Sequence, residues 1–454
     1  MNKVYTYYYL IGVGGIGMSA LARFFNAMGK KVYGYDKTPS PLINELMAEG
    51  VEIQFEDEVE KIPIEIRENK EQSLIVYTPA IPNENIIFQY FTLGQFDLFK
   101  RSKVLGMVTD DSLNISVAGT HGKTTTSSMV AAIFMRSNKR FTAFLGGISA
   151  DLGSNFYHQE GEGAHYSITE ADEYDRSFLE LNPTWAVITS TDSDHLDIYG
   201  TAQEIQATFS QFASKLDKDN LLQSMQSELD IKSANYAASN VLGDYHATAI
   251  RWEQNGTYFS IVEGDHILMK DLYLNIPGIH NLENAVAAAV ICSKADISEE
   301  IIKKGLAEFK GIKRRFEFIV KEEDLVFIDD YAHHPSELDS IISSVRELFP
   351  HKKIVGIFQP HLYSRTNDFA ADFAQSLQAL DELYLLPIYP AREKPIEGVS
   401  SKFLFELIDM PNKHLVEKDQ LFNQLEFDKI DVLLTLGAGD IDRLVQPLKE
   451  KYHG

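Results

Sequence analysis

The feature that most constrains the fold is a buried strand that runs directly into a glycine-rich loop and then into a helix. The run Leu113–Ala118 is apolar enough to be covered on both faces, as strands of parallel sheets are. The loop that follows exposes backbone N–H groups to phosphate oxygens, with Lys123 to neutralise charge and the Thr124 hydroxyl to meet Mg²⁺. A full Walker spacing would place glycine at Val117, so this phosphate loop is a shortened one. It comprises Gly119, Thr120, His121, Gly122, Lys123, Thr124 and Thr125. We therefore expect ATP to bind here.

Strand-like runs alternate with helical patterns along the whole chain, which is typical of α/β domains with parallel sheets. At ~150 residues per domain, 454 residues suggest about three domains. We expect domains over residues 1–110, 111–313 and 314–454. The first and last are predicted to be Rossmann-like and the central one to resemble a P-loop ATPase.

Composition excludes several other classes of protein. The formal charge of −24 disfavours binding to nucleic acid, and no apolar run is long enough for a membrane span. A single cysteine, Cys292, excludes an intrachain disulfide and any multi-cysteine metal site. We interpret Tyr7–Ile11 as a strand and not as part of a signal peptide, and we expect a cytoplasmic protein.

A second glycine-rich loop follows the strand at Tyr7–Ile11. Its glycines are Gly12, Gly14, Gly15 and Gly17, and a helix pattern over residues 18–28 comes next. Glycines in this context let backbone amides approach a diphosphate at the positive end of the helix. Asp36 ends the next strand, where an acid that binds ribose would lie. A purely structural glycine turn is the alternative.

Acidic residues and a histidine follow two later strands. Glu170 ends a strand over residues 166–170, with Asp172 and Glu173 next, and Asp194 and His195 follow a strand over residues 185–189. A carboxylate and an imidazole at neighbouring strand ends could hold Mg²⁺ above the phosphate loop. The alternative is that an acidic protein carries acids at strand ends without any metal.

Polar clusters in the last third of the chain are further candidates. His280, Asn281 and Asn284 adjoin an alanine-rich helix, where amide side chains could cap the helix or contact an adenine edge. Arginines at the boundary between the second and third domains could bind phosphate. Histidines after two later strands could contact substrate or nucleotide. These residues are Arg314, Asp330, His333, His334, His361 and Arg365.

Together, these motifs resemble those of the Mur ligase superfamily, in that family's order and across essentially the whole chain. Further carriers of the resemblance are the stretches 314–316, 330–335, 358–361 and 436–440. It implies a UDP-sugar-binding domain, an ATP-binding domain and a C-terminal domain that closes over the active site. It also implies an ATP-dependent, amide-forming ligase that works through an acyl phosphate in peptidoglycan precursor synthesis. The motifs fit the branch that joins L-alanine to UDP-N-acetylmuramate.

The resemblance also implies roles for individual residues. The catalytic set would be Lys123, Glu170, His195, His361 and Arg365, with Thr124, Glu170 and His195 at Mg²⁺. The ATP contacts would be Gly119 to Thr125, His280, Asn281, Asn284, Arg314 and Asp330. Gly14, Gly15 and Gly17 would hold the UDP diphosphate, with Asp36 nearby. His333, His334, His361 and Arg365 would face the muramoyl carboxylate and the alanine, and His361 or His333 would assist in deprotonating the amine.

Three positions depart from the family's usual pattern: Tyr174, Ser190 and Leu362, the last of which replaces a common arginine. The nearest alternative function is a ligase that joins a recycled murein tripeptide to the same sugar nucleotide. From other classes, a nicotinamide-dependent oxidoreductase or a non-catalytic nucleotide sensor remain alternatives. We expect a monomer or weak homodimer.

Overall fold

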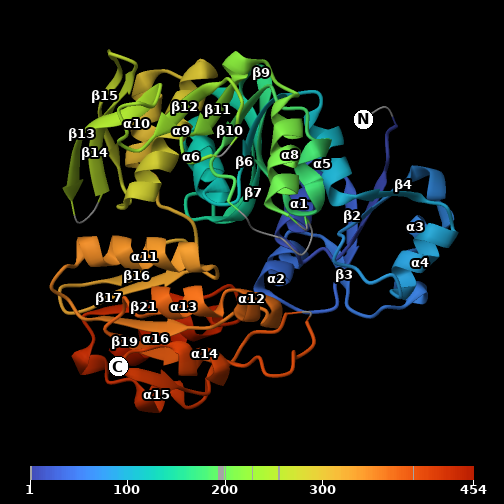
Figure 1. Ribbon diagram of the computed structural model, residues 1–454. Helices are drawn as coiled ribbons and strands as arrows, with labels where there is room; N and C mark the ends of the chain where they lie inside the picture. Colours follow the sequence, from blue (N-terminus) through green and yellow to red (C-terminus); the bar gives the residue numbers. More distant parts are fainter. Residues whose placement is uncertain are drawn as a thin grey trace. The chain divides into compact units, whose positions relative to one another are not determined.

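The computed structural model describes residues 3–192, 199, 201–227, 229–253, 256–391 and 393–453. This described chain divides into two compact units (Figure 1). Unit 1 comprises Met1–Ile276 and His280–Lys310, and unit 2 comprises Pro277–Ile279 and Gly311–Gly454. Within the described ranges, unit 1 contains two sheets and unit 2 contains one. None of the described helices is long and apolar enough to span a membrane.

The N-terminal sheet has the order β3-β2-β1-β4-β5, and each of its pairings is parallel. Alternate residues of β1 face opposite ways: Tyr8 and Leu10 pack with α1 and α5, whereas Tyr9 and Ile11 pack with α3 and α4. Helices therefore cover both faces, as predicted for a Rossmann-like domain. The strands are β1 (Tyr7–Ile11), β2 (Lys31–Tyr35), β3 (Glu52–Gln54), β4 (Ser73–Tyr77) and β5 (Asp97–Lys100). The helices are α1 (Ile16–Ala27), α2 (Pro41–Ala48), α3 (Ile64–Glu68), α4 (Ile86–Leu93) and α5 (Arg101–Thr109).

The central sheet is mixed and has the order β15-β14-β13-β12-β11-β10-β6-β9-β7-β8. Pairings from β13 through β7 are parallel, and antiparallel strands flank them: β8 on one side, β14 and β15 on the other. The strands are β6 (Leu113–Ala118), β7 (Lys139–Ser149), β8 (Ser154–Gln159), β9 (Glu162–Ala171), β10 (Trp185–Ile188), β11 (Leu221–Ser224), β12 (Ala234–Ala237), β13 (Tyr245–Glu253), β14 (Gly256–Glu263) and β15 (His266–Leu274).

Helices α6 (Lys123–Met135), α8 (Ala202–Ala213), α9 (Ile279–Lys294) and α10 (Glu299–Ala307) accompany this sheet, with a 3₁₀ segment η3 (Tyr174–Glu180). Helix α6 is buried along most of its length because α10 packs closely on it. A Cβ on Gly305 of α10 would lie 2.7 Å from the Ile133 Cα, so only glycine allows this approach. The phosphate loop therefore connects β6 to a helix, α6, whose position is fixed by close packing against α10.

The sheet of unit 2 has the order β16-β17-β21-β18-β19-β20, parallel except for β16 against β17. Separate apolar clusters cover its two faces. The strands are β16 (Glu317–Lys321), β17 (Val326–Asp330), β18 (Ile354–Phe358), β19 (Glu382–Leu385), β20 (Lys413–Leu415) and β21 (Val432–Leu436). The helices are α11 (Pro335–Leu348), α12 (Tyr363–Asp368), α13 (Ala370–Leu377), α14 (Ser401–Leu407), α15 (Leu421–Gln424) and α16 (Asp442–His453).

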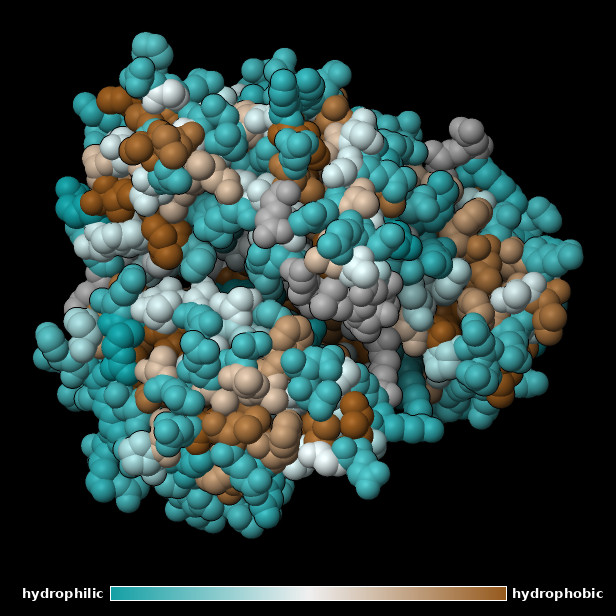
Figure 2. Space-filling model, viewed as in Figure 1, coloured by the Kyte–Doolittle hydropathy of each residue, from teal (hydrophilic) through white to brown (hydrophobic). Residues whose placement is uncertain are grey.

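Hydrophilic residues cover most of the face shown in Figure 2, and hydrophobic residues gather there in separate patches. Such scattered apolar exposure is ordinary for a folded chain. The strands predicted at Tyr7–Ile11 and Leu113–Ala118 are confirmed, and the strand predicted at residues 185–189 ends one residue earlier.

Candidate active site

The phosphate loop requires its glycines. Gly119 has φ +137° and Gly122 has φ +79°, backbone conformations that side chains rarely adopt. A Cβ on Gly119 would also lie 2.0 Å from the Thr189 Oγ1. The loop geometry is therefore closed to other residues at both positions.

The end of the neighbouring strand holds this loop in place. The Thr120 amide donates to the Ser190 carbonyl at 3.1 Å, and the His121 amide donates to the Ser190 Oγ at 2.8 Å. Thr189 donates its hydroxyl to the Ala118 carbonyl at 3.1 Å. Sequence reasoning missed Thr189 and treated Ser190 only as a departure. The available signal was their position directly after β10, the parallel neighbour of β6.

Lys123 begins α6 and points back over the loop. Its Nζ lies 2.8 Å from the Glu173 Oε2 and 2.5 Å from the Gly119 carbonyl oxygen. Burial alone would lower the pKa of Lys123, but the carboxylates of Glu173, Glu170 and Asp172 raise that pKa above its ordinary value. Lys123 is therefore a fixed cation at neutral pH, held in position by Glu173.

Glu170 is the carboxylate that best fits a Mg²⁺ site. Its Oε2 accepts the Gly146 amide at 3.0 Å, and a Cβ on Gly146 would lie 2.2 Å from the Glu170 Oε1. Burial raises the pKa of Glu170, although the Lys123 charge and a hydrogen bond from Thr124 oppose the shift. The Thr124 hydroxyl and the buried Glu170 carboxylate therefore lie together. Hard oxygen donors of this kind are the ligands that Mg²⁺ prefers.

The remaining predicted ligand, His195, lies outside the described residues, as does Asp194. Within the part of the chain that the structure describes, no group of three or more histidine, cysteine, aspartate or glutamate side chains could hold a metal. Thr124 and Glu170 are thus the predicted Mg²⁺ ligands that the structure describes, and ligation by His195 stays a prediction.

Asn284 supports the phosphate loop from helix α9. Its Oδ1 accepts the Thr126 hydroxyl at 3.1 Å, and a Cβ on Gly122 would lie 2.7 Å from the same oxygen. Asn284 lies within α9 and so does not cap the helix, whereas His280 and Asn281 lie in the first turn of α9. The contact of these three residues with ATP stays a prediction.

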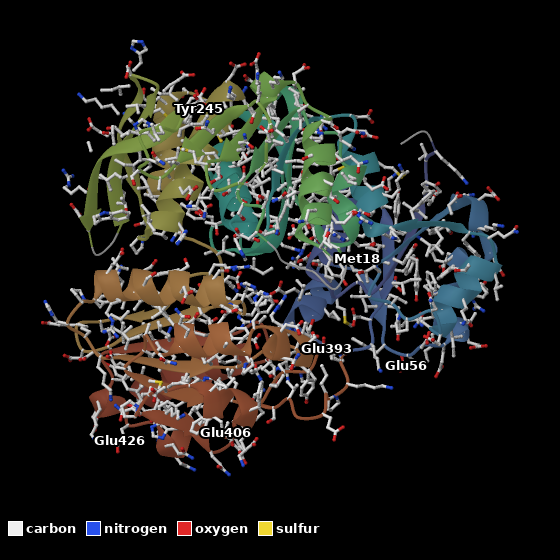
Figure 3. All side chains as sticks on the ribbon, viewed as in Figure 1. Met18, Glu56, Tyr245, Glu393, Glu406 and Glu426 are labelled. Atoms are coloured by element: carbon white, nitrogen blue, oxygen red, sulfur yellow. The ribbon has the colours of Figure 1, made fainter. Side chains whose placement is uncertain are left out.

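At the N-terminal glycine loop, Asp36 contacts the loop itself. Its Oδ2 accepts the Gly14 amide at 2.9 Å, and its Oδ1 accepts the Thr38 amide at 3.1 Å. Gly15 is the N-cap residue of α1, and Met18 in the first turn of this helix is labelled in Figure 3. Gly14, Gly15 and Asp36 are thus brought together, and diphosphate binding there stays a prediction.

In unit 2, Arg314 braces a turn after β21. Its Nη2 donates to the Gly437 carbonyl at 2.5 Å, and its Nε lies 3.3 Å from the Asp329 Oδ2. The guanidinium also lies 5.0 Å from the ring centroid of Tyr331. These contacts position Arg314 beside the predicted histidine cluster, and its contact with phosphate stays a prediction.

Asp330 has both carboxylate oxygens engaged by backbone. Oδ2 accepts the Phe316 amide at 2.7 Å and Oδ1 accepts the Ala332 amide at 2.8 Å. Burial raises the pKa of Asp330 to about 6, although the Arg315 charge opposes the shift. In this structure Asp330 shapes the loop that carries the histidines.

The structure brings His333 and His361 together, with ring centroids 5.8 Å apart. Tyr389 stacks on His361 at 5.9 Å. Burial, with the nearby His333 and Arg365, lowers the pKa of His361 to about 4. His334 serves differently: its Nδ1 accepts the Ser336 amide at 3.4 Å and caps α11.

Leu362, at the position of the family's usual arginine, has φ +69°. Its amide donates to the Tyr389 carbonyl at 3.0 Å, which ties the start of α12 to the segment after β19. Glu393 (Figure 3), which sequence reasoning missed, accepts both the amide and the hydroxyl of Ser364. Helix α12, which carries Arg365, is therefore held near its start by contacts with both Tyr389 and Glu393.

Three family models match successive parts of the chain. The Mur ligase family catalytic domain matches residues 7–112, the Mur ligase middle domain residues 117–292, and the Mur ligase glutamate ligase domain residues 314–439. The chain therefore belongs to the Mur ligase family, and the predicted resemblance is confirmed.

Among its relatives is a UDP-N-acetylmuramate–L-alanine ligase from Parabacteroides distasonis, 47% identical over an alignment of 457 positions that covers 99% of this chain and 98% of the relative. The crystal structure of a UDP-N-acetylmuramate–alanine ligase from Thermotoga maritima is 25% identical, with a TM-score of 0.82 over 98% of this chain and 99% of that one. A murein peptide ligase from Psychrobacter arcticus shares the fold at 19% identity and a TM-score of 0.72, over 98% of each chain. The predicted three-domain α/β architecture is thereby confirmed.

Proposed function

We propose that this chain joins L-alanine to the carboxylate of UDP-N-acetylmuramate in an ATP-dependent reaction. The observation that carries the proposal is the phosphate loop with Lys123 fixed between loop carbonyls and Glu173, beside Glu170. The full-length similarity to L-alanine ligases supports the choice of substrates.

A carboxylate is a poor electrophile, so an amide bond requires activation. The γ-phosphoryl group of ATP passes to the muramoyl carboxylate, which gives an acyl phosphate and ADP. Lys123 stabilises the charge on the transferring group, and this electrostatic contribution is the dominant one in phosphoryl transfer. The backbone amides of Gly122 to Thr125 would hold the nucleotide phosphates, because those of Thr120 and His121 are bonded to Ser190.

Thr124 and Glu170 would hold Mg²⁺, with His195 as the further predicted ligand. The bound ion would neutralise phosphate charge and fix the orientation of the β- and γ-phosphates. This assignment rests on the two oxygen donors that lie together at Glu170.

The amine of L-alanine then attacks the acyl carbon, the amide bond forms and inorganic phosphate leaves. Arg365 would bind the alanine carboxylate. His361, with its pKa lowered to about 4, is neutral at physiological pH and can accept a hydrogen bond from the amine. The same low pKa makes it a weak base, so we assign His361 to orienting the amine.

The test is phosphate release from ATP and Mg²⁺ with UDP-N-acetylmuramate, comparing L-alanine, the murein tripeptide and no amine. We expect release with L-alanine alone, and none from a Lys123→Ala variant that remains folded. Release with the tripeptide alone would assign the chain to tripeptide recycling. Nucleotide binding without turnover under all three conditions would favour the sensor alternative, and a nicotinamide-dependent absorbance change would favour the oxidoreductase.

A further inference from the structure

Arg101, the first residue of α5, lies directly over the first turn of α1. Its Nη1 is 2.6 Å from the position that a Cβ on Gly17 would occupy. The backbone at Gly17 has no positive φ, so its conformation alone does not demand glycine. The absence of a side chain at Gly17 lets the Arg101 guanidinium lie against the first turn of α1.

The second terminal nitrogen of Arg101 is engaged by an acid from the central domain. Its Nη2 donates to the Asp172 Oδ2 at 3.1 Å. The Arg101 side chain is 18% exposed and that of Asp172 is 39% exposed, so water reaches the pair. Such a pair contributes little stability and can exchange partners at low cost.

The surface beneath the guanidinium suits an anion. Among the residues that the structure describes, no N-cap side chain accepts from the first-turn amides of this 12-residue helix, which lie at the positive end of its dipole. The planar fork of an arginine matches phosphate oxygens in a way that lysine cannot. The guanidinium and the N-terminus of α1 thus lie next to each other at Gly17.

We propose that Arg101 binds the diphosphate of the UDP-sugar over the first turn of α1, and that Asp172 holds the guanidinium until the nucleotide displaces it. This inference rests on the proposed function, because that function supplies the UDP-sugar. Arg101 would give the diphosphate a positively charged contact, which the backbone amides of the glycine loop alone do not provide. It also links substrate binding to the strand end that carries Glu170, two residues before Asp172.

The inference is tested by calorimetric binding of UDP to the full chain without ATP, for wild type and three variants. Arg101→Gln should weaken UDP binding ~10-fold or more, as expected for loss of charged hydrogen bonds. Asp172→Asn should bind UDP as tightly as wild type or more tightly, because Arg101 no longer has to leave a carboxylate. Lys100→Gln is the matched control: it removes a neighbouring exposed cation that pairs with Asp175, and should alter UDP binding by less than about twofold.

The comparison of Arg101→Gln with Asp172→Asn separates a role of Arg101 in UDP binding from a purely structural role. If Arg101 served only to tie α5 to Asp172, Arg101→Gln and Asp172→Asn would weaken UDP binding equally, and the inference would be overturned. Unchanged UDP binding by Arg101→Gln would overturn it as well. Equal midpoints of thermal unfolding in all variants would show that they fold.

A final comparison distinguishes the two anions of the substrate. UDP and UDP-N-acetylmuramate should lose affinity for Arg101→Gln by the same factor. A loss confined to UDP-N-acetylmuramate would assign Arg101 to the muramoyl carboxylate and overturn the diphosphate assignment. Failure of wild type to bind either compound would instead contradict the proposed function, a result that the Arg101 comparison cannot produce.

Discussion

The titration of His361 offers a direct test of the geometry of the histidine cluster. Burial, with the nearby His333 and Arg365, lowers the pKa of this imidazole from 6.5 to about 4. At ~1.4 kcal/mol per pKa unit, the difference corresponds to at most ~3.5 kcal/mol that disfavours the charged ring in the folded state.

The sign follows from proton binding. Below about pH 6.5 the unfolded chain takes up a proton at His361, whereas the folded chain does so only near pH 4. The stability that His361 contributes is therefore complete above pH 6.5 and falls as the pH drops. Between about pH 7.5 and pH 4.5 the loss from this residue is ~2.5 kcal/mol.

Two measurements check this prediction. In histidine-ring NMR spectra, the signal that disappears in His361→Gln should titrate in wild type with a midpoint near 4, well below the ordinary imidazole value of about 6.5. Hydrogen exchange of β18, corrected for intrinsic rates, should show that His361→Gln removes ~2.5 kcal/mol of the pH dependence of unfolding in unit 2. Exchange is needed because both tryptophans, Trp185 and Trp252, lie in unit 1. A midpoint at about 6 or above would refute the reasoning.

Three further predictions concern other parts of the structure. Asp330→Asn should change the pH dependence in the opposite direction: with its pKa raised to about 6, Asp330 by itself takes ~2 kcal/mol from the stability of unit 2 between about pH 4.5 and pH 7.5, and hydrogen exchange should show the variant gaining ~2 kcal/mol relative to wild type over that range. Gly119→Ala, which would place a Cβ 2.0 Å from the Thr189 hydroxyl, should abolish ATP binding measured by calorimetry, while UDP binding persists; retained ATP affinity would contradict the loop geometry. Asn155→Ala removes a buried side-chain amide whose oxygen accepts from Arg23 at 2.7 Å, and it should destabilise unit 1 by ~1–3 kcal/mol. Urea titrations followed by tryptophan fluorescence measure this change, and an unchanged midpoint would contradict the prediction.

Local patterns predicted the elements well where strand, loop and helix follow one another directly. The strand Leu113–Ala118 and the glycine loop after it were predictable because buried parallel strands are continuously apolar and phosphate loops need positive-φ glycines. The pairing of Lys123 with Glu173 was not predictable. It joins the start of α6 to the end of β9, and only the order of strands in the sheet brings these ends together.

The sequence by itself determined which residue types are available for phosphate and carboxylate chemistry, because that information lies in short motifs with fixed spacing. Tertiary structure alone decided how each is used. His333 and His334 are adjacent in the chain, yet one contacts His361 and the other caps α11, because successive side chains leave a backbone in different directions. The low pKa of His361 likewise comes from packing, since a single chain position carries no information about how much water its side chain will lose.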